Sequence, residues 1–170
     1  LIIQKITEIH VWFSGRLIVI SDLHLGIYKN TNFLQKVVDK INKIENIDAV
    51  LIPGDFTYYP PEDLVKLFSP LKNIKVPIYA VLGNHDSENP GPAIQRKLQQ
   101  ALETNGVIFL NNTYSKIENK NITILWLGDH WANDDDVSKI SNCEGFKIVL
   151  WLNFKIKKSK ISSTLKNGNN

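Results

Sequence analysis

The sequence predicts an α/β domain built on a parallel sheet. Short apolar runs alternate with segments of helical periodicity over the first 110 residues, as in consecutive β-α-β units. The length of 170 residues suits one domain. A composition of 43% hydrophobic and 22% charged residues provides enough apolar side chains for a core and argues against a disordered chain.

The first predicted elements are two strands and a helix. Residues 3–12 alternate loosely between apolar and polar side chains, as in an edge strand with His10 on its surface. Residues 16–21 form an apolar, β-branched run that predicts a buried strand. A helix through about residue 44 follows, with Thr31 or Asn32 as its N-cap and apolar residues at helical spacing.

The middle of the chain repeats this order. Residues 49–52 predict another buried strand. Pro60 and Pro61 then open a helix, and the carboxylates of Glu62 and Asp63 favour its N-terminus. The apolar stripe of this helix consists of Leu64, Leu67, Phe68 and Leu71.

The remaining elements continue the alternation. Residues 76–82 predict a strand, and a helix over residues 93–104 ends at Asn105 and Gly106. Further strands are predicted at residues 107–110, 122–127 and 147–152.

The last residues differ in composition from the rest of the chain. Residues 153–170 are basic and polar and lack an apolar stripe, as in a disordered tail. Residues 1–146 carry a net charge of −3 and residues 147–170 a net charge of +6, so the overall charge of +3 belongs to the tail. The mildly acidic body indicates no nucleic-acid partner.

Several classes of protein are excluded by composition. The single cysteine, Cys143, excludes an internal disulfide and a cysteine-rich metal finger. No apolar run approaches the roughly 18 residues that span a membrane. The first residues also lack the basic and apolar regions of a signal peptide. We therefore expect a cytoplasmic protein with no transmembrane segment.

Polar residues follow three of the predicted strands. Asp22 and His24 follow the strand at 16–21, Asp55 follows the next one, and Asn84 and His85 follow the third. His24 precedes Asp55 by 31 residues, and Asp55 precedes Asn84 by 29, which is about one β-α-β unit in each case. Because ligands bind at the carboxyl ends of parallel strands, these side chains are expected at one edge of the sheet.

These residue types predict a metal centre. Carboxylate, imidazole and amide ligands suit Mn, Fe, Zn or Mg. Asp55 follows the middle strand, where its carboxylate can bridge two ions. Two ions that lie roughly 3.5–4 Å apart would hold a hydroxide for in-line attack on phosphorus. His85 would then face the substrate, with Asp86 as its orienter. Alternatively, all these residues are ordinary turn residues with capping side chains.

Taken together, the motifs D-x-H, G-D and G-N-H-D resemble the calcineurin-like metallophosphoesterase superfamily. The stretch Ser-Asp-Leu-His-Leu-Gly at residues 21–26 most resembles its bacterial phosphodiesterase branch, and the resemblance covers about residues 16–150. It implies a two-sheet sandwich flanked by helices within residues 1–152. It also implies a phosphomonoesterase or phosphodiesterase with two divalent metal ions, which uses a metal-bound hydroxide on a phosphate-ester substrate.

The resemblance also implies a role for each motif residue. Asp22 and His24 would bind the first metal ion, and Asp55 would bridge both ions. Asn84 would bind the second ion and help to hold a phosphate oxygen. His85 would protonate the leaving group or stabilise charge in the transition state.

Two further segments are candidates for the substrate cleft. His130 is a weak candidate for substrate binding, and residues 134–136, three aspartates, either line the cleft or form a solvated run. Residues 58–61, Tyr-Tyr-Pro-Pro, either wall the cleft near Asp55 or pack on the core.

The chain departs from the family pattern near its end. The family has further metal-binding histidines downstream, whereas the last histidine of this chain is His130. The first metal site is therefore better preserved than the second. The change of composition near residues 147–152 predicts a truncation or frame change that leaves the fold incomplete. Two alternatives to an active enzyme follow: an inactive relic, or a metal-binding scaffold that self-associates through an exposed incomplete sheet.

Overall fold

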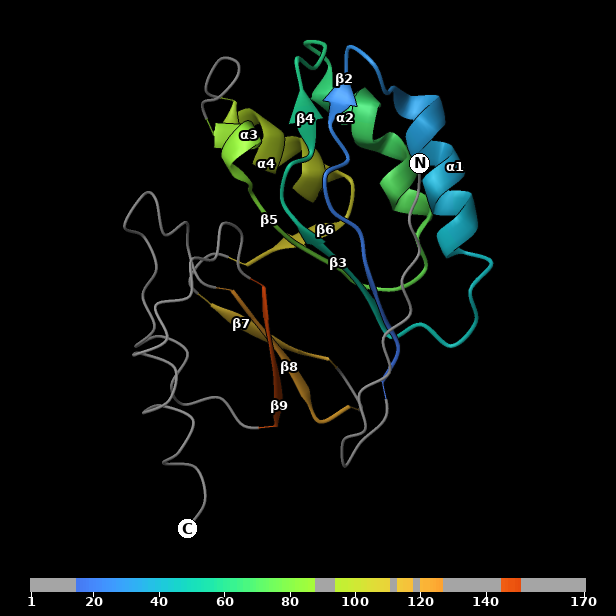
Figure 1. Ribbon diagram of the computed structural model, residues 1–170, viewed down its shortest axis with the longest axis vertical. Helices are drawn as coiled ribbons and strands as arrows, with labels where there is room; N and C mark the ends of the chain where they lie inside the picture. The colour runs from blue at the N-terminus through green and yellow to red at the C-terminus, as the bar shows by residue number, and fades with distance from the viewer. Residues whose placement is uncertain (1–14, 88–93, 111–112, 118–119, 127–144, 151–170) are drawn as a thin grey trace.

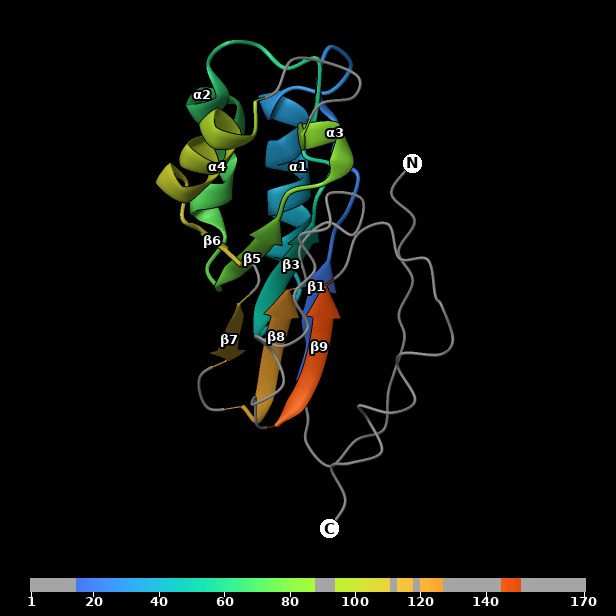
Figure 2. The same ribbon diagram turned by 90° about the vertical axis from the view of Figure 1, so that its left-hand side faces the viewer.

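The computed structural model describes residues 15–87, 94–110, 113–117, 120–126 and 145–150, with the backbone alone for Asn84, Ser87 and Leu150. These residues form a layer of helices, a four-stranded sheet and a three-stranded sheet (Figures 1 and 2). The expected α/β class and the two-sheet sandwich are confirmed. In the described part of the chain, the helices lie over one face of the four-stranded sheet.

The four-stranded sheet is parallel throughout, and its strand order is β1-β3-β5-β6. Each strand lies within or next to an apolar run that the sequence marks as a strand. Because all the strands run in the same direction, the loops that follow β1, β3 and β5 leave the sheet at one edge. The strands are β1 (Leu17–Val19), β3 (Ala49–Pro53), β5 (Ile78–Val81) and β6 (Val107–Phe109).

The three-stranded sheet is mixed. Strand β8 (Ile122–Trp126) pairs antiparallel with β7 (Tyr114–Ile117) and parallel with β9 (Phe146–Leu150). The sequence predicts β8 and β9 but not β7. Strand β7 has only four residues, and of these only Ile117 is buried, so it has too few apolar residues for a strand pattern.

Two cores lie on opposite faces of the four-stranded sheet, because successive side chains of a strand point to opposite faces. On β3, Val50 and Ile52 pack in the core with the helices, whereas Leu51 faces the three-stranded sheet. Ile124 and Trp126 of β8 complete the second core. Burial on both faces explains why β3 is a continuous apolar run rather than an alternating one.

Helix α1 (Thr31–Ile41) begins one residue after its cap, Asn30, whose side chain accepts a hydrogen bond of 3.2 Å from the backbone N–H of Phe33. The predicted caps, Thr31 and Asn32, are wrong because both lie inside the helix. The helix also ends before residue 44, because it stops at Ile41. The side chain of the next residue, Asn42, donates a hydrogen bond to the backbone carbonyl of Asn73, 31 residues later in the chain.

Helix α2 (Leu64–Phe68) begins later than Pro60 and Pro61 suggested. Its N-cap is Asp63, whose carboxylate accepts a hydrogen bond of 2.9 Å from the backbone N–H of Lys66. The helix continues into a 3-10 turn, η1 (Ser69–Asn73), so the predicted stripe through Leu71 is buried along both segments.

Helix α4 (Gln95–Thr104) agrees with the helix predicted over residues 93–104. Asn105 is its C-cap, and Gly106 follows with a φ of 84°. This backbone conformation favours glycine, as the sequence signal assumes.

Three very short elements lie beyond the sheet edge and have no counterpart in the sequence prediction. Strand β2 (Leu25–Gly26) pairs parallel with β4 (Thr57–Tyr58), and α3 (Asn84–Ser87) is a single helical turn. Elements of this length have no periodicity to detect. They nevertheless fix the loops that carry the motif residues.

Several predictions fall outside the described residues. These are the strand at residues 3–12 with His10, the cleft residues His130 and 134–136, Cys143, and the tail at 153–170. Within the described residues, no helix is long and apolar enough to cross a membrane.

Candidate metal centre

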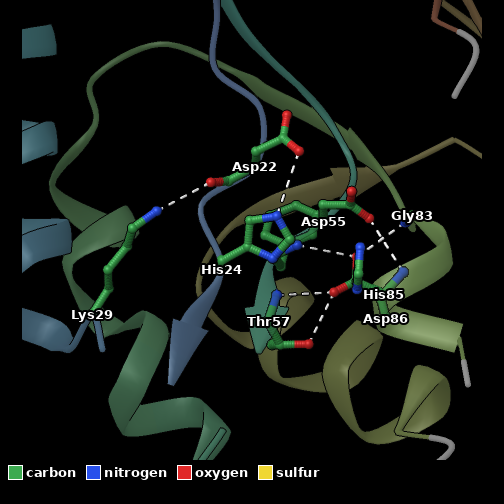
Figure 3. A network of polar contacts seen from close by, with 9 residues as sticks. Asp22, His24, Lys29, Asp55, Thr57, Gly83, His85 and Asp86 are labelled. Carbon is green, nitrogen blue, oxygen red and sulfur yellow. Dashed lines mark hydrogen bonds and ion pairs between the residues drawn. The ribbon is translucent and has the colours of Figure 1, made fainter. Parts of the chain in front are cut away.

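The loops that follow β1, β3 and β5 bring together three side chains that could hold a metal ion (Figure 3). One ligand atom each from His24, Asp55 and His85 lies within 4.8 Å of the other two. The imidazole rings of His24 and His85 have centroids 5.0 Å apart and an interplanar angle of 79°. The expectation that the motifs meet at one edge of the sheet is met for these three residues.

Asp22 lies at the open side of this cluster. Its Oδ1 is 3.5 Å from Nε2 of His24, and its side chain is 63% exposed, against 27% for His24. The ammonium group of Lys29 donates a hydrogen bond of 3.4 Å to the backbone carbonyl of Asp22 and lies over the ring of Phe33. Lys29 therefore ties the Asp22 loop to α1.

Three of the candidate ligand residues have strained backbone conformations. Asp22, His24 and Asp55 have φ values of 57°, 44° and 55°. Residues other than glycine rarely adopt positive φ, at a cost of about 1–3 kcal/mol each, and such residues cluster at functional sites. The fold keeps these side chains where a glycine would be more stable.

Two glycines allow the loops after β3 and β5 to touch. A Cβ at Gly54 would lie 2.5 Å from the backbone N of Gly83, and a Cβ at Gly83 would overlap the carboxylate and backbone of Asp55. At Gly54 the φ of 88° favours glycine, whereas Gly83 is required by the close approach of Asp55.

Asp86 holds these two loops together. Its Oδ2 accepts hydrogen bonds from the backbone N–H groups of Phe56 (3.2 Å) and Gly83 (3.0 Å). Its Oδ1 accepts from the backbone N–H and the hydroxyl of Thr57, both at 3.0 Å. The carboxyl is fully buried, and this burial raises its pKa although the four hydrogen bonds oppose the shift.

This network differs from the expected role of Asp86 as the orienter of His85. Within the described residues, all hydrogen bonds of the Asp86 carboxylate go to the two loops and none to the His85 ring. The physical reason is the single turn α3, in which Asp86 points into the protein while the neighbouring His85 lies beside His24. Asp86 is thus a positioning residue for the Asp55 loop.

The cluster has the properties that a divalent cation requires. Nδ1 of His24 and Nδ1 of His85 are buried and have no hydrogen-bond partner among the described residues. Asp55 is buried too, and its Oδ1 accepts a hydrogen bond of 3.2 Å from the backbone N–H of His85. Buried polar atoms without partners are costly, and a cation bound between them would remove that cost. Imidazole with carboxylate suits Mn, Fe or Zn.

Some of the predicted site residues have no described side chain, and the structure brings further residues to the site. The backbone of Asn84 starts α3, but its side chain lies outside the described part, as do His130 and residues 134–136. The hydroxyl of Thr57, which donates to Asp86, is an addition. Tyr58 belongs to the run at residues 58–61 that was expected either to wall the cleft near Asp55 or to pack on the core, and its ring lies beside His24.

The chain is similar in sequence to known metallophosphoesterases. The family model described as calcineurin-like phosphoesterase matches residues 15–162. The chain is 31% identical over 66% of its length to a "Transmembrane protein with metallophosphoesterase domain" of Danio rerio. It is 30% identical over 77% of its length to the uncharacterized metallophosphoesterase YkoQ of Bacillus subtilis. It spans only 25% and 50% of these two relatives.

Proposed function

Because the chain belongs to the calcineurin-like phosphoesterase family, we propose that it hydrolyses phosphate esters at the cluster of Asp22, His24, Asp55 and His85, with divalent metal ions as cofactors. The observation that carries this proposal is the convergence of His24, Asp55 and His85 within 4.8 Å, with two buried imidazole nitrogens that lack partners. Both phosphomonoesters and phosphodiesters fit the proposal.

The proposed ligands divide between two ions. Asp22 and His24 would hold the first ion, Asp55 would bridge both, and Asn84 would hold the second. When bound, the ions supply Lewis acidity, which lowers the pKa of a water molecule and offsets charge on the phosphoryl oxygens. The hydrogen bond from the His85 backbone to Oδ1 of Asp55 keeps this carboxylate directed at the cluster.

His85 is proposed to donate a proton to the leaving-group oxygen. Its ring lies beside His24 in the cluster, and its Nδ1 has no hydrogen-bond partner among the described residues. General acid catalysis of this kind contributes typically 10²–10⁴-fold to a rate. The same ring is also close enough to the other ligands to bind a metal ion, so the two roles need separate tests.

Hydrolysis of bis-para-nitrophenyl phosphate and para-nitrophenyl phosphate with added Mn²⁺ tests the proposal. Metal-dependent turnover is expected for the chain and should be lost in Asp55→Asn. The matched control is Asp39→Asn, because Asp39 is an exposed carboxylate on α1 with a single hydrogen bond to Gln35. Turnover that Asp55→Asn retains would refute the site.

Metal binding without turnover would favour one of the two alternatives, an inactive relic or a metal-binding scaffold. Self-association through an exposed sheet belongs to the scaffold alternative. Val19 and Val149 are exposed apolar residues on the edge strands β1 and β9 of the two sheets. A defined dimer by light scattering would then be expected.

A further inference from the structure

A row of aromatic rings extends from the metal centre to the protein surface. The ring of Tyr58 lies edge-on to His24, with centroids 6.2 Å apart and an interplanar angle of 82°. Tyr28 stacks on Tyr58, also at 6.2 Å, with an angle of 20°. Tyr59 meets Tyr58 edge-on at 4.9 Å. Tyr58 is thus the link between the ligand His24 and two outer tyrosines.

The outer part of this row is unusually exposed for apolar side chains. Tyr28 is 83% exposed, Ile27 65% and Tyr59 52%. Isolated exposed apolar residues are common, but a contiguous group beside a polar site marks a binding surface. The rings of Tyr28 and Tyr59 both meet the ring of Tyr58, and the backbone N–H of Ile27 donates a hydrogen bond to the carbonyl of Tyr58.

The backbone holds this group in place. Strands β2 and β4 pair with Gly26 opposite Tyr58, and a Cβ at Gly26 would overlap the backbone carbonyl of Tyr58. Tyr59 has a φ of 47°, a conformation that tyrosine rarely adopts. Tyr59 is about half exposed, and strain kept at such a residue points to a function.

We propose that this row, Tyr58 and Tyr28 with Ile27 and Tyr59 beside them, binds a planar aromatic or heteroaromatic ring in the organic group of the phosphate ester. The inference rests on the proposed function. Tyr28 stacks on Tyr58 through one face, and its high exposure leaves the other face open to a further ring. Tyr28 is itself two ring-to-ring steps from His24, so a ring bound on it belongs to a group larger than a simple alkyl ester.

A groove adjoins the row of rings. Ile27, Tyr59, Pro60, Pro61 and Leu67 line it together with the polar side chains of Asp63 and Lys66. It leaves room for the rest of the organic group beside a ring that stacks on Tyr28. The row therefore sets specificity for the organic group while the metal centre holds the phosphate.

The test compares two phosphodiesters that share the leaving group para-nitrophenol. One is the para-nitrophenyl ester of thymidine 5′-monophosphate, whose second ester group carries a ring, and the other is ethyl para-nitrophenyl phosphate, whose second ester group carries none. We expect a higher kcat/KM for the ring-bearing ester. The ratio of the two kcat/KM values should fall about 3- to 10-fold in Tyr28→Ala and persist in Tyr28→Phe.

Tyr114→Ala is the matched control, because Tyr114 is an exposed tyrosine on β7 of the other sheet. A ratio that stays the same in Tyr28→Ala, while both esters are hydrolysed, would overturn the inference and leave the proposed function intact. If neither ester is hydrolysed, the proposed function fails. The affinities of thymidine 5′-monophosphate and ethyl phosphate in the presence of Mn²⁺ then decide: equal affinities, or a Tyr28→Ala variant without effect, overturn the inference.

Discussion

His24 and His85 lie 61 residues apart in the sequence, yet their imidazole rings meet with centroids 5.0 Å apart at the open edge of the four-stranded sheet. Each ring has a buried Nδ1 without a partner among the described residues. A core would not leave two such nitrogens unsatisfied for packing alone. Their meeting is the strongest structural sign of a metal centre in this chain.

Asp86→Asn should destabilise the protein strongly, although aspartate and asparagine side chains have the same shape. Each oxygen of Asp86 accepts two hydrogen bonds, so the NH₂ group of asparagine would face N–H or O–H donors of the two loops. We expect a loss of about 2–4 kcal/mol in the free energy of unfolding, measured by urea denaturation. Asp39→Asn on α1 serves as the control. A loss below about 1 kcal/mol would show that Asp86 does not hold the loops.

Asp22→Gly should remove a metal ligand without weakening the metal-free fold. The side chain of Asp22 is exposed, and its φ of 57° suits glycine. Relief of strain and the entropy cost of glycine nearly cancel, so the free energy of unfolding in EDTA should change by less than about 1 kcal/mol. Asp39→Gly, inside helix α1, should cost about 1 kcal/mol. A larger loss for Asp22→Gly than for Asp39→Gly would contradict the strain argument.

Gly83→Ala should disturb the site more than Gly106→Ala. A Cβ at Gly83 would overlap Asp55, so the loop after β3 has to shift. A Cβ at Gly106 would meet no atom within 4 Å, and its cost comes only from a φ of 84°. We expect the free energy of unfolding to fall by about 1 kcal/mol in Gly106→Ala and by at least about 2 kcal/mol in Gly83→Ala. Metal binding should be lost in Gly83→Ala alone. Equal costs and retained metal binding in both variants would argue against close packing of the loops.

His85→Asn separates proton donation from metal binding. If His85 protonates the leaving group, kcat should fall about 100-fold or more for phenyl phosphate, whose leaving group needs the proton. The fall should be smaller for para-nitrophenyl phosphate, whose leaving group does not. Steady-state kinetics with both esters and a Mn²⁺ titration measure the two effects. A weaker Mn²⁺ affinity with equal losses for both esters would instead identify His85 as a ligand.

The sequence predicts the central strands well because their burial is simple. Strands β3 and β5 are buried on both faces and therefore read as continuous apolar runs. The site follows from the same parallel order, since polar residues after successive strands must meet at one edge. The sequence does not predict strand β7, because an edge strand of four residues with one buried side chain has almost no apolar pattern.

Other details depend on tertiary contacts that a sequence does not display. Asn30, Thr31 and Asn32 are all suitable caps, and only the extended backbone at Asn30 decides among them. Asp86 stands next to His85 in the sequence, which suggested a pair, but the turn α3 sends the two side chains in different directions. The positive φ values of Asp22, His24 and Asp55 likewise arise from the fold around them.

The most direct measurement is a calorimetric titration of the metal-free chain with Mn²⁺, alongside His24→Ala and Asp39→Asn. The metal centre predicts saturable binding to the unaltered chain, at least about 10-fold weaker binding to His24→Ala, and unaltered binding to Asp39→Asn. If the unaltered chain binds no Mn²⁺, or if His24→Ala binds it as tightly, the cluster of His24, Asp55 and His85 is not a metal centre.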